Sequence, residues 1–170
     1  MTNKNFIVFS FLALLLTGCG SMPRTPEVLV ENVKSGSMLS DKDAYVVKRP
    51  LAQVTGVLKE KSAECLNQKI ETSWWERGLH RRMVTAFTPR VTASKERTRL
   101  TLQSKIIEGS TEVGDPPPEG WYMMVVDAYA VDKNTTRIES YFQQSSYKGA
   151  FTATKAWVTG ANMGCPDLTQ

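Results

Sequence analysis

Few side chains in this sequence belong to the types that carry out covalent or acid–base chemistry. The only histidine is His80, and neither it nor any of the three cysteines lies in a nucleophile-elbow, zinc-protease or phosphate-binding motif. Two carboxylate pairs, Glu108 with Glu112 and Asp115 with Glu119, could act on a sugar as acid and base. Because these pairs fall in a Gly- and Pro-rich stretch, a solvated surface is the simpler interpretation. We therefore expect no enzyme, no catalytic residue, no metal and no cofactor.

Aromatic and basic side chains gather in one short segment. It contains Trp74, Trp75, Arg77, Arg81 and Arg82 within nine residues. Indole rings and guanidinium groups are frequent among the residues that dominate protein interfaces, and they also suit sugars and carboxylates. The segment is therefore the candidate partner surface. In the alternative interpretation, one tryptophan packs in the core and the arginines solvate a hairpin.

Length and charge narrow the class of protein. With 170 residues, 41% hydrophobic and 22% charged, the chain suits one ordinary globular domain. This composition excludes a disordered chain, a disulfide-dense miniprotein and a multi-pass membrane protein. The formal net charge of +4 is spread along the chain, with neither a zinc-finger spacing nor an RNA-binding motif. We expect no nucleic-acid partner.

The beginning of the chain has the form of a bacterial export signal. Lys4 precedes an apolar run at 6–16, which is too short to cross about 30 Å of hydrocarbon. The run ends in Leu16-Thr17-Gly18-Cys19, and these residues resemble the lipobox of bacterial lipoproteins. That resemblance predicts a signal peptide at 1–18.

The lipobox resemblance implies a lipid anchor. Cleavage after Gly18 would leave Cys19 attached to diacylglycerol and acylated, for example with palmitate, on its new amino group. Two or more chains hold firmly, because each buried methylene contributes about 0.8 kcal/mol. Gly20, where Asp would retain an enteric lipoprotein in the inner membrane, implies the outer membrane with the domain in the periplasm. The alternatives are a soluble secreted protein cut near Ser21 and an uncleaved membrane anchor.

Export to the periplasm determines the expected oxidation state of the other two cysteines. In the oxidising periplasm, two remaining thiols in one small domain usually pair, so we expect a disulfide between Cys65 and Cys165. The alternative is two free buried thiols, since cysteine is also a common small core residue.

The mature chain divides into a tether and one domain. Residues 19–43 are rich in Ser, Gly, Pro and charged side chains, which predicts a flexible tether, with a short edge strand at 27–31 as a further expectation. Residues 44–170 form the domain. The Pro-rich stretch 109–120, with Trp121 and Tyr122 at its base, predicts a protruding loop, either a presented epitope or a long connection.

Hydrophobic periodicity predicts an α+β fold. An antiparallel sheet of about four to five strands carries two helices on one face, in the order β-α-β-β-β-β-α. In architecture alone, this layout is similar to the helix-grip domains of some outer-membrane assembly lipoproteins. The stretch 121–131 is apolar on both sides, which predicts a central strand covered on each face or left open for a partner. The helices fall at 51–67 and 150–162, and the strand-like runs at 44–47, 69–75, 83–91, 98–107, 121–131 and 136–144.

Three functions are compatible with these features. The first is a non-enzymatic outer-membrane lipoprotein that binds an envelope protein or a peptidoglycan component. The second is a lipoprotein that carries a small apolar or lipidic ligand between sheet and helices. The third is a hydrolase that would use Glu112 and Glu119.

Overall fold

One antiparallel sheet forms the centre of the molecule. The structure is a computed structural model that describes residues 22–36, 40–109, 114–143 and 148–169. Within these residues, six strands lie in the order β1-β6-β5-β4-β3-β2, and every neighbouring pair is antiparallel. The elements are α2 (Pro26–Lys34), β1 (Ser40–Val47), α3 (Leu51–Cys65), β2 (Lys69–Glu76), β3 (Leu79–Ala93), β4 (Arg97–Glu108), β5 (Trp121–Asp132), β6 (Thr135–Gln143) and α4 (Lys148–Thr159).

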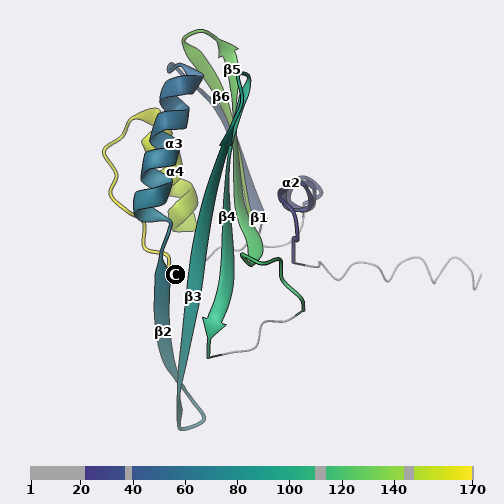
Figure 1. Ribbon diagram of the computed structural model, residues 1–170, viewed down its shortest axis with the longest axis vertical. Coiled ribbons are helices and arrows are strands. Elements are labelled where there is room, and N and C mark those ends of the chain that lie inside the picture. The colour runs from purple at the N-terminus through teal and green to yellow at the C-terminus, as the bar shows by residue number, and fades with distance from the viewer. Residues whose placement is uncertain (1–21, 37–39, 110–113, 144–147, 170) are drawn as a thin grey trace, which may run out of the picture.

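Helices α3 and α4 cover one face of the sheet, as the periodicity predicts (Figure 1). Pro50 precedes α3. Along this helix the buried side chains, among them Leu51, Val54 and Leu58, form one stripe that faces the sheet. Helix α4 adds small residues and one indole ring to the same core. Together with the facing side chains of the strands, they form one buried cluster that includes Leu51, Val54, Leu58, Leu100, Leu102, Met124, Val126, Ile138, Phe142, Ala150, Ala153 and Trp157.

A third helix lies on the opposite face, where the sequence analysis expected a tether. Figure 1 shows α2 on the side of the sheet away from α3 and α4. Its Leu29 and Val33 are buried against Val125 and Tyr141 of the sheet. The prediction of a strand at 27–31 is therefore wrong: Thr25 caps the first turn by accepting from the Val28 N–H, and the two buried side chains lie four residues apart.

The predicted tether is shorter in the structure for a second reason. Strand β1 begins at Ser40 and pairs with β6 along all of its length, from Ser40 opposite Gln143 to Val47 opposite Thr136. Strand β1 is a charged edge strand that begins before the apolar run 44–47 that signalled it. The sheet has six strands where about four to five were expected, because five strands, β2 to β6, lie between α3 and α4 where the predicted order had four.

Strand β5 is covered on both faces. Met124 and Val126 point into the core under α3 and α4, whereas Val125 points to α2. Of the two expectations for 121–131, cover on each side is confirmed for the middle of the strand. The described part of the Pro-rich stretch lies outside the strands, between β4 and β5, as the proline content predicts.

Candidate interaction surface

The segment singled out in the sequence forms the tip of a β-hairpin that projects beyond the rest of the sheet (Figure 1). Strands β2 and β3 meet in a two-residue turn in which both central residues, Arg77 and Gly78, have positive φ (50° and 79°). A turn of that hand matches the right-handed twist of the strands. Gly78 fits it without strain, whereas Arg77 is the only described residue other than glycine with positive φ.

Both tryptophans of the hairpin are exposed. Trp75 keeps 74% of its surface exposed and Trp74 keeps 40%, while the neighbouring Leu79 keeps 58%. The alternative in which one tryptophan packs in the core is therefore wrong. Trp75 lies opposite His80, with 5.3 Å between the ring centroids. Apolar surface of this size, at the end of a protruding hairpin, is available to a partner.

Two of the three arginines of the hairpin, Arg81 and Arg82, pair with carboxylates. Arg82 reaches Glu71 at 2.6 Å and Glu108 at 3.1 Å, and Arg81 reaches Glu76 at 3.4 Å. The hydrogen bond from Arg82 lowers the pKa of the Glu71 carboxyl below its ordinary value. All of these side chains are solvated, so the pairs contribute little to stability.

The carboxylates considered for hydrolysis do not assemble into an acid–base pair. Glu108 is paired with Arg82, and Asp115 lies 3.3 Å from Arg24. Glu119 accepts a long hydrogen bond of 3.5 Å from the Thr88 hydroxyl. Glu112 lies outside the described residues. That the protein is not an enzyme stays a prediction.

The side chains between the sheet and the α3–α4 layer form one contiguous buried cluster, in which Leu58, Leu102 and Met124 are fully buried. Two surface hollows have volumes of about 460 and about 420 Å³. The first is at the β3–β4 turn beside Arg97 and Tyr129. The second opens between the last turns of α3 and strand β3, and Ala63 and Thr88 are among its lining residues. Both are wide open to solvent. Neither supports an apolar ligand held inside the fold.

A buried ion pair on the α2 face was missed in the sequence. Asp127 accepts two hydrogen bonds from Arg99, at 2.7 and 2.8 Å, and Arg99 also pairs with Glu27 of α2. The hydrogen bonds that Arg99 donates to Asp127 raise the pKa of its guanidinium above the ordinary range. A lone carboxylate in the middle of the apolar run 121–131 was the available signal, since a buried charge requires a partner.

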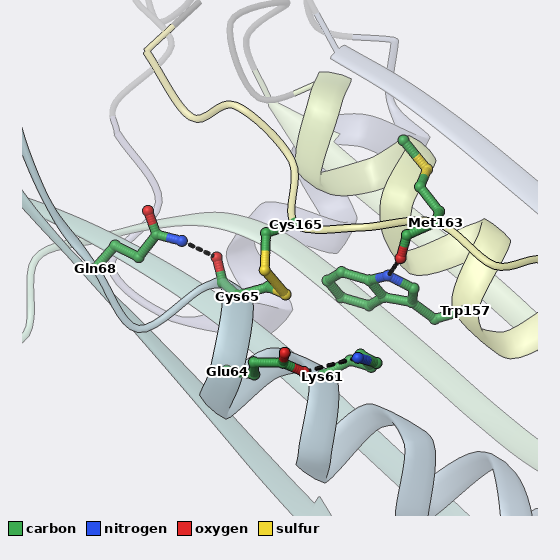
Figure 2. The surroundings of a disulfide bond; sticks show 7 residues. All are labelled: Lys61, Glu64, Cys65, Gln68, Trp157, Met163 and Cys165. Atoms are coloured by element: carbon green, nitrogen blue, oxygen red, sulfur yellow. Dashed lines mark hydrogen bonds and ion pairs between the residues drawn. A yellow bond between two sulfur atoms is a disulfide. The ribbon is translucent and has the colours of Figure 1, made fainter.

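Cys65 and Cys165 form a disulfide, as predicted (Figure 2). Cys65 ends α3, but Cys165 lies in the segment that follows α4 rather than at the end of that helix. Figure 2 shows Trp157 of α4 beside the bond, where its Nε1 donates to the Met163 carbonyl at 3.0 Å. The disulfide thus fastens the C-terminal segment across the helix layer. Glu64 lies next to both sulfur atoms, but these are bonded to each other and are not metal-binding thiolates.

Cys19 and the rest of the lipobox lie outside the described residues. No helix in the described part of the chain combines the length and the apolar character needed to cross a bilayer.

The chain has no match among protein-family models, and no curated protein matches it. Solved structures that are similar to it include the following three. A hypothetical protein from Helicobacter pylori has 14% identity and a TM-score of 0.42, with 82% of this chain and 94% of that chain covered. A protein from Arthrobacter aurescens has 12% identity and a TM-score of 0.31, covering 74% and 80%. An uncharacterized protein from Rhizobium leguminosarum has 9% identity and a TM-score of 0.26, covering 71% and 91%. Likenesses this weak carry no argument about function.

Proposed function

We propose that this protein is a bacterial lipoprotein, held in the outer membrane by acyl chains on Cys19. Its periplasmic domain binds another envelope component, a protein or peptidoglycan, without catalysing a reaction. The lipobox residues 16–19 support the anchor, and the exposed hairpin of β2 and β3 supports the binding role. The single observation on which the binding role depends is the exposure of Trp75 at the hairpin tip.

The tryptophans would dominate the binding energy. An indole side chain covers about 200 Å², so covering the exposed part of Trp75 removes about 150 Å² from water and contributes about 4 kcal/mol before the cost of association. Arg81 and Arg82, which Glu76 and Glu71 hold in position, would add directed hydrogen bonds to carboxylates or sugar hydroxyls of the partner.

Mass spectrometry of the membrane-extracted protein tests the anchor. We expect a chain that begins at Cys19, with the mass of a diacylglycerol and one further acyl group. A second spectrum after reduction and alkylation reports the disulfide. A mature chain that still begins at Met1, or that carries an unmodified Cys19, contradicts the anchor.

Photo-crosslinking in living cells tests the binding surface. A photoreactive amino acid is placed at Arg77 in the hairpin turn or, as a matched control, at Lys133 in the exposed β5–β6 turn at the other end of the sheet. We expect a discrete adduct from position 77 and none from position 133. Binding of the purified protein to isolated sacculi distinguishes peptidoglycan from a protein. Equal labelling from both positions, together with no sacculus binding, refutes this surface.

Substitution then measures the contribution of the tip. We expect Trp75→Ala to weaken binding to the identified component by about 30-fold, which corresponds to about 2 kcal/mol for a central interface residue. Val131→Ala is the control, because Val131 is also exposed, at 59%, but lies far from the hairpin. A Trp75→Ala protein that binds as tightly as the control excludes the tip as the contact.

A further inference from the structure

The described chain joins the fold almost as soon as it begins. Pro23 is buried, and its carbonyl accepts a hydrogen bond from the Tyr122 N–H of β5 at 3.1 Å. Arg24 then pairs with Asp115, Thr25 caps α2, and Glu27 of α2 pairs with Arg99. Residue 23 is therefore already fixed to the sheet, and this leaves no long tether between the domain and residue 19.

This attachment leaves only a short linker between the domain and Cys19. We call this linker, residues 20–22, the leash. Only residues 20–22 separate Cys19 from Pro23, so four Cα–Cα steps span at most about 14 Å. If Cys19 is lipidated, as proposed above, Pro23 lies no further than this from the membrane surface. A tether over 19–43 would have allowed about 85 Å.

The leash is attached near the middle of the long axis of the sheet. The strand register places Tyr122 opposite Gln103, which lies opposite Thr88 on β3. From Thr88 the strand continues eight residues to His80, which is about 26 Å at a rise of about 3.3 Å per residue. In the other direction, β5 continues from Tyr122 to Asp132, about 33 Å. Both ends of the sheet therefore extend further from Pro23 than the leash can reach.

From these lengths we infer that the domain lies on its side on the bilayer, with the strands close to the membrane plane and the α2 face toward the lipid. An upright domain would drive either the hairpin or the β5–β6 turn into the membrane. If the hairpin points toward the membrane, its roughly 26 Å of strand must fit within the height of about 14 Å at which the leash holds Pro23. The strands must then be inclined by at least about 55° from the membrane normal. For the opposite end, the limit is about 65°.

The choice of face follows from the side on which the chain leaves the sheet. Pro23 contacts the strand beside Tyr122, whose ring packs with the α2 cluster, and Figure 1 shows α2 opposite the α3–α4 layer. The described chain, which leads directly into α2, therefore begins on the α2 side of the sheet. The inference rests on the proposed lipid anchor and adds an orientation to it: α3, α4 and the disulfide face away from the membrane, and the hairpin extends along the membrane surface.

A fluorophore at single positions tests this orientation on the lipidated full-length protein. Because Cys19 is acylated and Cys65 is bonded to Cys165, an introduced cysteine is the single free thiol of each variant. Arg90→Cys labels the α2 face of β3, and Glu60→Cys labels the outer surface of α3; both positions are exposed. The protein is reconstituted in vesicles of phosphatidylethanolamine and phosphatidylglycerol that contain a lipid with a nitroxide on its headgroup, which quenches only at short range.

We expect strong quenching at position 90 and little at position 60. A linker of about twelve Gly and Ser residues inserted after Gly20 extends the reach to about 55 Å, and the difference between the two positions should then disappear. Equal quenching at both positions without the linker, or stronger quenching at position 60, overturns the orientation. Mass spectrometry of the same samples separates the two proposals: an unacylated Cys19 refutes the anchor, whereas an acylated protein without the difference refutes the orientation alone.

Discussion

The packing of α2 against the sheet leads to a stability prediction that separates a folded N-terminal segment from a free tether. Leu29 is fully buried and contacts the cluster formed with Val33, Val125 and Tyr141. Replacing it with alanine removes three carbon atoms, the Cγ and both methyl groups, and leaves a cavity. Fully buried leucines lose between about 2 and 5 kcal/mol when truncated in this way. We expect about 3 kcal/mol for Leu29→Ala, since α2 is a surface helix that can partly collapse onto the vacancy.

The control lies on the same helix. Val28 is only half buried, and alanine has the higher helix propensity, so Val28→Ala should change the free energy of unfolding by less than about 1 kcal/mol. Glu27→Ala removes a partner of Arg99, but the Glu27 side chain is 70% exposed, and Asp127 stays paired with Arg99. Its cost should also stay below about 1 kcal/mol.

Urea unfolding followed by circular dichroism measures these differences under oxidising conditions. A second readout is limited proteolysis, which should cleave the Leu29→Ala protein within 22–36 faster than the Val28→Ala protein. If Leu29→Ala unfolds at the same urea concentration as Val28→Ala, α2 does not contribute packing energy. The short leash inferred from its attachment would then fail as well.

Three further predictions concern the remainder of the fold. Replacing both Cys65 and Cys165 with serine opens a loop of 100 residues, and we expect a loss of at most about 4.7 kcal/mol in urea unfolding; no loss would show that the bond constrains nothing. Gly120→Ala should destabilise strongly by thermal melting, since φ is +94° and the new Cβ would lie 2.0 Å from the Ser104 carbonyl oxygen; Gly56→Ala, with open space, is the control. Burial raises the pKa of Tyr141 to about 12, so its contribution to stability is complete below pH 10 and is lost between pH 10 and 12. Tyr141→Phe should flatten that alkaline decline, and an unchanged pH profile would contradict it.

The two-layer part of the fold was predictable from the sequence because its signals are local. The helix beginning after Pro50 and the alternation of Leu100, Leu102 and Ile106 in β4 are periodic patterns that need no partner to be recognised. The disulfide was predictable for a different reason, since an exported domain with two remaining thiols usually pairs them. The sequence also located the segment that forms the hairpin tip. It did not predict that Trp74 and Trp75 are both exposed, because their exposure depends on the tight turn at Arg77 and Gly78.

Helix α2 was not predictable by the same means. Its sequence, Pro-Glu-Val-Leu-Val-Glu-Asn-Val-Lys, contains three β-branched valines in nine residues, and these favour a strand in isolation. The helix forms because Thr25 caps it and because the sheet offers Val125 and Tyr141 to cover Leu29 and Val33. Tertiary packing here overrides local propensity. The sequence of residues 26–34 alone does not indicate that β5, far along the chain, has an apolar side that this helix can cover.

The ion pair below α2 explains why this helix is held in one place. Arg99 and Asp127 lie on neighbouring strands, and their side chains are only 13% and 3% exposed. Glu27 brings a second carboxylate to Arg99 from the first turn of α2, and Lys34 of the last turn lies over the Tyr141 ring at 5.4 Å. Apolar packing alone would let a short helix slide along the sheet, whereas contacts at both of its ends fix the register. Position 23 is then set relative to the strands, and the length of the leash becomes a constraint on how the whole domain meets the membrane.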